Sequence, residues 1–207
     1  MTSILCYGDS NTWGWNPLTE KRYDHYERWP RVMQNILGGE FHVIEEGLNG
    51  RTTVHDDILE EGRNGKEYLL PCLRSHKPLD WVVLLLGTND LKKRYNVSSE
   101  EIGKSIGLLA RMILTSECGA GGSAPQLIVV CPPPILELGE FKTMFQGGRE
   151  KSLLLKDYIC VHAIELKVHF LDLSKVISSS EVDGIHWDKE SQYKVGNQVA
   201  RIILDQQ

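Results

Sequence analysis

The stretch Trp81-Val82-Val83-Leu84-Leu85-Leu86 is apolar at every position. A strand with one face in water alternates apolar and polar side chains, so an unbroken apolar run predicts a strand that is covered on both faces. Four further apolar runs, at Ile4–Tyr7, Phe41–Glu45, Leu127–Cys131 and Val168–Leu171, predict the remaining strands. The sequence therefore predicts five strands, with residues 81–86 at the centre of a parallel sheet.

Longer amphipathic segments separate these strands. They predict helices at Arg28–Leu37, Lys66–Ser75, Ser98–Glu117, Arg149–Leu166 and Lys189–Leu204. Alternating strands and helices predict an α/β fold, a three-layer α/β/α sandwich around a doubly wound five-stranded parallel sheet. We expect residues 1–207 to form one domain, because this length buries a sizeable core and no linker or repeat divides the chain.

Two stretches carry no regular pattern, Asn16–Glu27 and Pro132–Gly148. Loops of this length in a compact domain are usually functional walls, lids or oligomer contacts. We therefore expect both to lie near a binding site or an interface.

The composition narrows the range of partners. With 23 basic and 28 acidic side chains the net charge is −5, which argues against a nucleic-acid partner. The one tight basic run, Lys92-Lys93-Arg94, is expected to be a solvated loop. No apolar run reaches the roughly 20 residues that cross a bilayer, so no membrane partner is expected. The N-terminal residues show no secretory signal, and five cysteines without a CxxC pair favour a reduced, cytoplasmic protein.

Four unusual segments follow predicted strands. Gly8-Asp9-Ser10 follows the first strand, Gly47–Arg51 the second and Gly87–Asp90 the third, while Asp183–His186 lies in the long loop after the fifth. In an open parallel sheet, ligands bind outside the carboxyl ends of the strands. If the strand order is 2-1-3-4-5, the first three segments are immediate neighbours. The sequence thus predicts a site at this edge of the sheet.

The residue types at this edge indicate acyl transfer on a serine. A serine hydroxyl is a poor nucleophile unless an adjacent base, oriented by a third group, activates it. Asp183 and His186 supply an acid and an imidazole in the order that a Ser…Asp…His triad uses. Taken alone, Ser10 is better explained as a helix cap, an interpretation that His186, Asn89 and Gly50 in order make unlikely, and Asp9 is better explained as a turn or capping residue.

A second serine motif is a decoy. Gly103-Lys104-Ser105-Ile106-Gly107 satisfies GxSxG, but that motif requires a strand-to-helix elbow, and this copy lies inside a predicted helix. Its Gly-Lys-Ser also mimics the end of a P-loop, yet Ser98 stands where the first glycine should be.

Five blocks together resemble a known family. In chain order they are "ILCYGDSNTWGW", "VIEEGLNGRTT", "LLLGTND", "PPP" and "DGIHW". They resemble the SGNH (GDSL-type) hydrolases, and within them the bacterial arylesterase/acyltransferase branch. The resemblance implies a flavodoxin-like SGNH hydrolase fold.

The resemblance also implies roles for individual residues. Ser10 would be the nucleophile, His186 its general base, and Asp183 the group that orients the imidazole. The oxyanion hole would consist of the backbone N–H groups of Ser10 and Gly50 and the side-chain amide of Asn89. Donors placed where negative charge develops are worth about 3–4 kcal/mol each when they are removed singly.

Three further residues are expected at the substrate pocket: Asn11, Trp13 and Thr88. Related enzymes often have leucine after the serine, so Asn11 is expected to make the pocket mouth more polar. Trp13 and Trp15 could each line the acyl pocket or pack the first loop against the sheet, and we favour a pocket or interface role for Trp13. The six histidines other than His186 show no metal-ligand spacing, and no metal or cofactor is expected.

The sequence therefore predicts a serine esterase that acts on small short-chain acyl or aryl esters, with water as acceptor. The resemblance makes transfer to alcohols plausible and implies a homo-oligomer, with the loop at residues 132–148 as an interface element. The alternatives are a carbohydrate O-acetyl esterase, a lysophospholipase or thioesterase of the same superfamily, and a flavodoxin-like binding module without catalysis. These residues do not name the natural ester.

Overall fold

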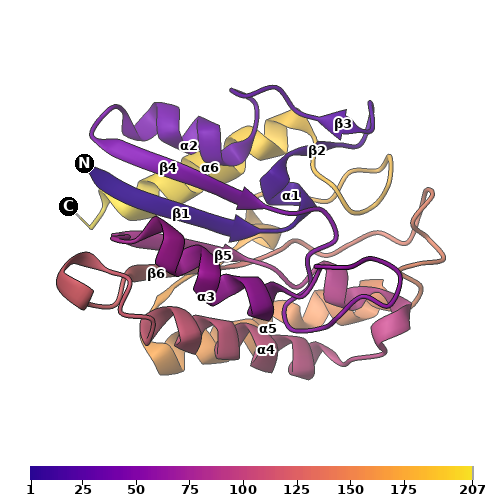
Figure 1. The fold of residues 1–207 in the computed structure, drawn as a ribbon. Helices are drawn as coiled ribbons and strands as arrows, with labels where there is room; N and C mark the ends of the chain where they lie inside the picture. Colours follow the sequence, from indigo (N-terminus) through magenta and orange to yellow (C-terminus); the bar gives the residue numbers. More distant parts are fainter. Residues whose placement is uncertain (207) are drawn as a thin grey trace.

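A computed structural model describes residues 1–206 (Figure 1). Five strands form one sheet: β1 (Thr2–Gly8), β4 (Phe41–Gly47), β5 (Trp81–Leu85), β6 (Gln126–Cys131) and β7 (His169–Asp172). Their order is β4-β1-β5-β6-β7, and every neighbouring pair is parallel. Counted along the chain, this is the order 2-1-3-4-5, so the predicted fold class is confirmed.

Helices cover both faces of this sheet (Figure 1). On one face lie α2 (Trp29–Leu37) and α6 (Lys189–Leu204), which pack against each other. On the other lie α3 (Gly65–His76), α4 (Ser99–Leu114) and α5 (Gly148–Leu166), with α4 packed on α5. The bounds of these helices are close to those that the sequence predicts. The largest difference is at the end of α4, which stops at Leu114 and is followed by a C-cap at Thr115, whereas the predicted helix ends at Glu117.

The central strand is buried as the sequence predicts. Val82 and Leu84 belong to the core cluster beneath α3, α4 and α5, while Val83 and Leu85 belong to the cluster beneath α2 and α6. Burying an aliphatic side chain of this size contributes about 1.5–3 kcal/mol. Because β5 supplies both clusters, it joins the two halves of the core.

The region after β1 contains elements that the sequence did not reveal. The short helix α1 (Ser10–Trp13) begins two residues after β1 ends, and β2 (Trp15–Asn16) pairs with β3 (Lys21–Arg22) in a small antiparallel hairpin. Two-residue strands are too short to show a period of two, so the stretch at residues 16–27 was expected to be irregular. The described residues also form four single-turn 3-10 helices: η1 (Asn89–Leu91), η2 (Lys93–Tyr95), η3 (Ala120–Gly122) and η4 (Leu173–Lys175).

The Pro132–Gly148 stretch is irregular up to residue 139, as expected, and forms turns over residues 140–147, after which α5 begins at Gly148. Four of the five cysteines are buried, and Cys160 is partly exposed. In the part of the chain that the structure describes, the helices all lack the length and apolar character needed to cross a bilayer.

Glycine at the end of β4 allows α1 to lie against the edge of the sheet. A Cβ atom on Gly47 would stand 2.6 Å from Cα of Trp13 and 2.6 Å from the carbonyl carbon of Thr12. Both are backbone atoms, which cannot move without shifting α1. The close approach of β4 and α1 therefore requires glycine here.

We predict that Gly47→Ala destabilises the protein by about 1–3 kcal/mol, because the added methyl group must displace the backbone of α1. Urea unfolding measures this difference. Gly39→Ala is the matched control, since nothing lies within 4 Å of the Cβ position at Gly39. Equal unfolding free energies for the two variants would contradict the predicted packing.

Candidate active site

Ser10 lies where β1 turns into α1. Asp9 is the N-cap of α1, and its carboxylate accepts a hydrogen bond from the Asn11 backbone N–H at 3.0 Å. Ser10 is 5% exposed, and its Oγ lies 2.9 Å from Nε2 of His186. The capping role expected for Asp9 is therefore what the structure shows, and Ser10 faces the loop that follows β7.

Asp183 holds the imidazole of His186. His186 Nδ1 lies 2.6 Å from Asp183 Oδ2, and Oδ1 of the same carboxylate accepts the backbone N–H groups of Ile185 and His186, each at 2.9 Å. Burial opposes ionisation of Asp183, but these three hydrogen bonds and the charge on His186 outweigh it, and the pKa of Asp183 is lowered. An ionised carboxylate only accepts hydrogen bonds, so Nδ1 donates to Asp183 and Nε2 is the ring nitrogen that faces the Ser10 hydroxyl.

Gly50 and Asn89 lie in the same cavity as Ser10. Asn89 Nδ2 donates to the Arg51 carbonyl at 3.1 Å, which fixes the amide and leaves the second hydrogen of that nitrogen for another acceptor. Gly50 has a left-handed backbone, with φ of 76°, where a side chain would be strained. The three groups expected to form the oxyanion hole are thus brought together at the ends of β1, β4 and β5.

Arg51 fixes the loop that carries Gly50. Its Nη1 donates to the carbonyl of Gly8 at 2.9 Å and also to the carbonyl of Glu46, so it joins the ends of β1 and β4. Its guanidinium carbon lies 4.1 Å from the ring centre of Tyr7. Sequence reasoning missed this residue, although an arginine directly after Gly50 in a strand-end loop was the available signal.

The cavity beside Ser10 has a volume of about 220 Å³. The Trp15 ring centre lies 5.5 Å from that of His186, and Phe141 meets the same imidazole edge-on at 5.7 Å. The residues that line the cavity fall into three groups: the polar groups of the centre (Ser10, Gly50, Asn89, His186), an apolar set (Trp15, Phe141, Met144, Phe145, Ile185) and a second polar set (Asn49, Glu60, Lys92).

Three residues expected at the pocket do not line this cavity. Asn11 is 1% exposed, and its Nδ2 donates to the Ile185 carbonyl at 3.4 Å, so it bridges α1 to the histidine loop. Trp13 packs under the Arg22 guanidinium, at 5.0 Å from its ring centre. Thr88 is buried at the start of η1. The left-handed turn at Gly14 places Trp15, not Trp13, at the cavity.

Asp90 and Lys92, which follow β5, are both buried. The carboxylate of Asp90 accepts hydrogen bonds from both the backbone N–H and the hydroxyl of Thr53, at 3.0 and 2.5 Å. Lys92 was expected in a solvated loop, but it is only 4% exposed and lines the cavity. The short 3-10 helix η1 turns the chain inward at this point, which a run of three basic residues does not indicate.

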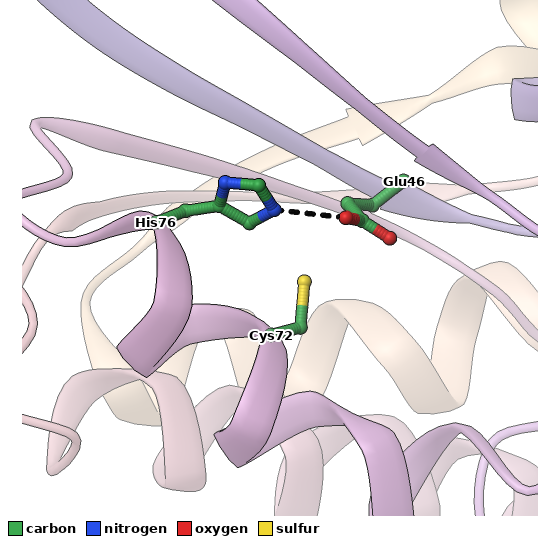
Figure 2. Close-up of side chains that lie close together, drawn as sticks. All are labelled: Glu46, Cys72 and His76. Carbon is green, nitrogen blue, oxygen red and sulfur yellow. Dashed lines mark hydrogen bonds and ion pairs between the residues drawn. The ribbon is translucent and has the colours of Figure 1, made fainter.

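A separate cluster beside α3 has the donor types of a metal site (Figure 2). Glu46, Cys72 and His76 bring one ligand atom each within 4.8 Å of one another, and His76 Nε2 lies 2.9 Å from Glu46 Oε1. Burial and the Glu46 carboxylate raise the pKa of the Cys72 thiol to about 12, and the Arg51 cation acts on the same thiol. The contact between His76 and Glu46 joins α3 to β4.

The comparisons with known proteins agree on one family. The chain is 39% identical to a carbohydrate acetylesterase from Sinorhizobium meliloti, over 100% of both chains with a TM-score of 0.96. It is 38% identical to an aryl esterase from M. smegmatis, over 99% of both chains with a TM-score of 0.94. No curated protein sequence matches the chain.

The fold and these likenesses define a carboxylic ester hydrolase. The chain belongs to the GDSL-like lipase/acylhydrolase family, whose profile matches residues 6–192. The resemblance to the SGNH hydrolases and the predicted class of enzyme are thereby confirmed.

We predict that Asp9→Asn alters the pH dependence of stability. Burial raises the pKa of Asp9 to about 6, against the opposing effects of the Asn11 N–H and of the charges on His186 and Arg51. The ordinary aspartate value, about 3.9, applies in the unfolded chain. The folded protein therefore binds the extra proton on Asp9 between about pH 4 and 6, and the contribution of Asp9 to stability grows as the pH falls through this range.

Asparagine keeps the helix cap but does not titrate. The unfolding free energy of the wild type relative to Asp9→Asn should therefore rise by about 2–3 kcal/mol between pH 7 and pH 4. Urea unfolding at a series of pH values measures this difference. A difference that stays constant over the range would contradict a raised pKa at Asp9.

Proposed function

We propose that the protein hydrolyses small carboxylic esters through an acyl-enzyme formed on Ser10. The observation that carries this proposal is the continuous chain of hydrogen bonds from Ser10 Oγ through His186 to Asp183, at 2.9 and 2.6 Å. This chain ends in a cavity that also contains Gly50 and Asn89. A binding module has no need of such an arrangement.

In the first half of the reaction, Ser10 Oγ attacks the ester carbonyl carbon while His186 Nε2 takes the hydroxyl proton. The carbonyl oxygen becomes an oxyanion, which accepts hydrogen bonds from the N–H groups of Ser10 and Gly50 and from the free hydrogen of the Asn89 amide. The bond to the alcohol oxygen then breaks, and His186 returns its proton to the departing alcohol. Asp183 stabilises the transient imidazolium.

In the second half, a water molecule attacks the acyl carbon of the Ser10 ester. His186 takes one proton from this water and gives it to Ser10 Oγ as the acyl bond breaks. The products are a carboxylic acid and the free enzyme. No step requires a group beyond these side chains, the substrate and water.

The cavity volume of about 220 Å³ supports short acyl chains and small alcohols. It lies below the roughly 300–1,000 Å³ of pockets that hold drug-sized ligands. A lysophospholipase or an acyl thioesterase has to hold a long acyl chain, so this volume argues against both. A carbohydrate O-acetyl esterase remains the second candidate, because the Sinorhizobium relative is described as a carbohydrate acetylesterase.

We also propose that the protein forms homo-oligomers. The support is a set of exposed apolar side chains on α5: Leu153, Leu154, Val161 and Ile164 are each at least half exposed. Exposed apolar patches of this kind commonly mark contacts between proteins. The loop at residues 132–148 also contributes three aromatic or apolar side chains to the cavity wall.

We predict that a fluorophosphonate probe labels the wild-type protein and fails to label Ser10→Ala. Ser105→Ala is the matched control, because Ser105 lies inside α4 and its hydroxyl donates to the Glu101 carbonyl. Hydrolysis of p-nitrophenyl acetate should fall by about 10⁴-fold or more in Ser10→Ala and stay unchanged in Ser105→Ala. Labelling that survives the loss of the Ser10 hydroxyl would refute the assignment of the nucleophile.

We further predict that alcohols compete with water for the acyl group. The apolar side chains around His186 favour an alcohol over water at the position from which the acyl-enzyme is attacked. In p-nitrophenyl acetate turnover with ethanol or benzyl alcohol present, the ester of the added alcohol should form alongside acetate. Gas chromatography of the products measures the ratio. Acetate as the sole product at high alcohol concentration would show that the enzyme is a hydrolase alone.

A further inference from the structure

Away from the cavity at Ser10, three side chains of the types that bind metals gather beside α3. Figure 2 shows the sulfur of Cys72 pointing toward the contact between His76 and Glu46, whose atoms lie 2.9 Å apart. One ligand atom from each residue lies within 4.8 Å of the other two. Among residues 1–206, no other group of three or more cysteine, histidine or carboxylate side chains gathers in this way.

The helix and the strand hold these residues in a fixed relation. Cys72 and His76 stand four positions apart on α3, so they share one face of the helix. Glu46 is the residue before the last in β4, which is paired with β1 along its whole length. Ligands on rigid elements are placed more precisely than ligands on loops. The sequence does not show this arrangement, because Glu46 lies far from the other two residues along the chain.

The donor set is one that zinc prefers. Zn²⁺ binds thiolate sulfur, imidazole nitrogen and carboxylate oxygen, and a site with three protein ligands completes its tetrahedron with water. With bonds of about 2.0–2.3 Å, the ligand atoms of such a site lie roughly 3.3–3.8 Å apart. His76 is the last residue of α3 and its side chain is 31% exposed, so its ring has room to adjust to this spacing. Magnesium and calcium prefer oxygen ligands, so a thiol and an imidazole select against them.

The charges of the cluster match those of a divalent ion. Zinc binds the thiolate form of cysteine, and a thiol that coordinates a metal is deprotonated. The Cys72 thiolate and the Glu46 carboxylate together balance the two positive charges of the ion. The Arg51 cation acts on the same thiol, but it then meets a site with no net charge. Arg51 is itself held by the carbonyls of Gly8 and Glu46, so it does not occupy the Glu46 carboxylate.

An ion can reach the cluster from solvent. Cys72 is buried, but the side chains of His76 and Glu46 are 31% and 19% exposed. Glu46 also lines a surface cleft together with Tyr68 and Glu67. Glu67 is exposed, and its carboxylate adds negative charge to this cleft, which attracts cations. A zinc ion can therefore approach between His76 and Glu46 and meet the sulfur beside them.

We propose that Glu46, Cys72 and His76 form a zinc site, with water as the fourth ligand. On binding, the Cys72 thiol loses its proton to water, and the ring proton of His76 lies on Nδ1 so that Nε2 binds the ion. The hydrogen bond between His76 and Glu46 is exchanged for two bonds to the metal. The ion then joins the end of β4 to the end of α3 and stabilises the folded chain. It shares no ligand with the site at Ser10, so the inference does not depend on the proposed function.

Cobalt(II) tests the identity of the ligands, because it replaces zinc in such sites and a thiolate ligand gives it a charge-transfer band in the near ultraviolet. Reduced protein that has been treated with a chelator is titrated with Co²⁺. The variants are Cys72→Ser and His76→Gln, with Cys160→Ser and His42→Gln as matched controls. Cys160 is partly exposed, whereas the other cysteines are buried, and His42 is an exposed histidine on β4.

The band should reach a plateau at one equivalent of Co²⁺ in the wild type and in both controls, and added Zn²⁺ should abolish it. Cys72→Ser should show no band. His76→Gln should need at least about tenfold more Co²⁺, since even the outer partners of a metal site contribute this much. A wild type without a saturable band, or an equal band in Cys72→Ser, would overturn the site. If Cys72→Ser does not fold, the partly exposed His76 decides, and an unchanged titration of His76→Gln would overturn the site.

Thermal unfolding gives a second readout. Zn²⁺ at a free concentration a hundredfold above its Kd should raise the Tm of the wild type by about 5–10 °C. At the same concentration, His76→Gln should gain at most about half of this rise, because its site is at least tenfold weaker. Mg²⁺ should leave the Tm of the wild type unchanged. An equal rise in His76→Gln and the wild type, or an equal rise with Mg²⁺, would also overturn the site.

Discussion

The candidate site depends on three neighbouring parallel strands ending at the same edge of the sheet. β4, β1 and β5 are adjacent, and the segments that follow them carry Gly50, Ser10 and Asn89. Arg51 holds this edge together by donating to the carbonyl of Gly8, the last residue of β1, and to that of Glu46, the residue before the last in β4. The loop after β7 completes the hydrogen-bonded chain by placing Nε2 of His186 beside Ser10 Oγ.

Buried charges are concentrated at this edge, and each has a fixed partner. Asp183 is ionised because hydrogen bonds outweigh its burial, whereas burial dominates at Asp9 and raises its pKa. Burial likewise raises the pKa of Asp90, although the backbone N–H and the hydroxyl of Thr53 both donate hydrogen bonds to its carboxylate. The pKa values of these carboxylates thus shift in different directions, according to whether the hydrogen bonds that each receives outweigh its burial.

The sequence predicts the sheet well and points to the candidate residues of the site, since both leave local signals. Unbroken apolar runs mark β5 and its neighbours, and Gly8-Asp9-Ser10 and Asp183–His186 are short segments in which chemistry requires particular residues. The pocket wall leaves no such signal. Trp13 was preferred to Trp15 as a pocket residue, and Lys92 was expected to be exposed to solvent. The sequence does not show where these side chains lie, because their positions depend on how the chain turns within two or three residues after a strand. Those turns are set by tertiary packing around Gly14 and η1.

The wall that carries Phe141, Met144 and Phe145 belongs to a loop between β6 and α5 and contributes no strand to the sheet. The reacting groups, in contrast, are tied to strand ends and buried hydrogen bonds. The candidate catalytic residues therefore lie on other segments than much of the cavity wall that would contact the substrate. Insertions or substitutions in this loop would reshape the cavity and leave the sheet unchanged. The same fold could then accept different esters through changes that cost little free energy of folding.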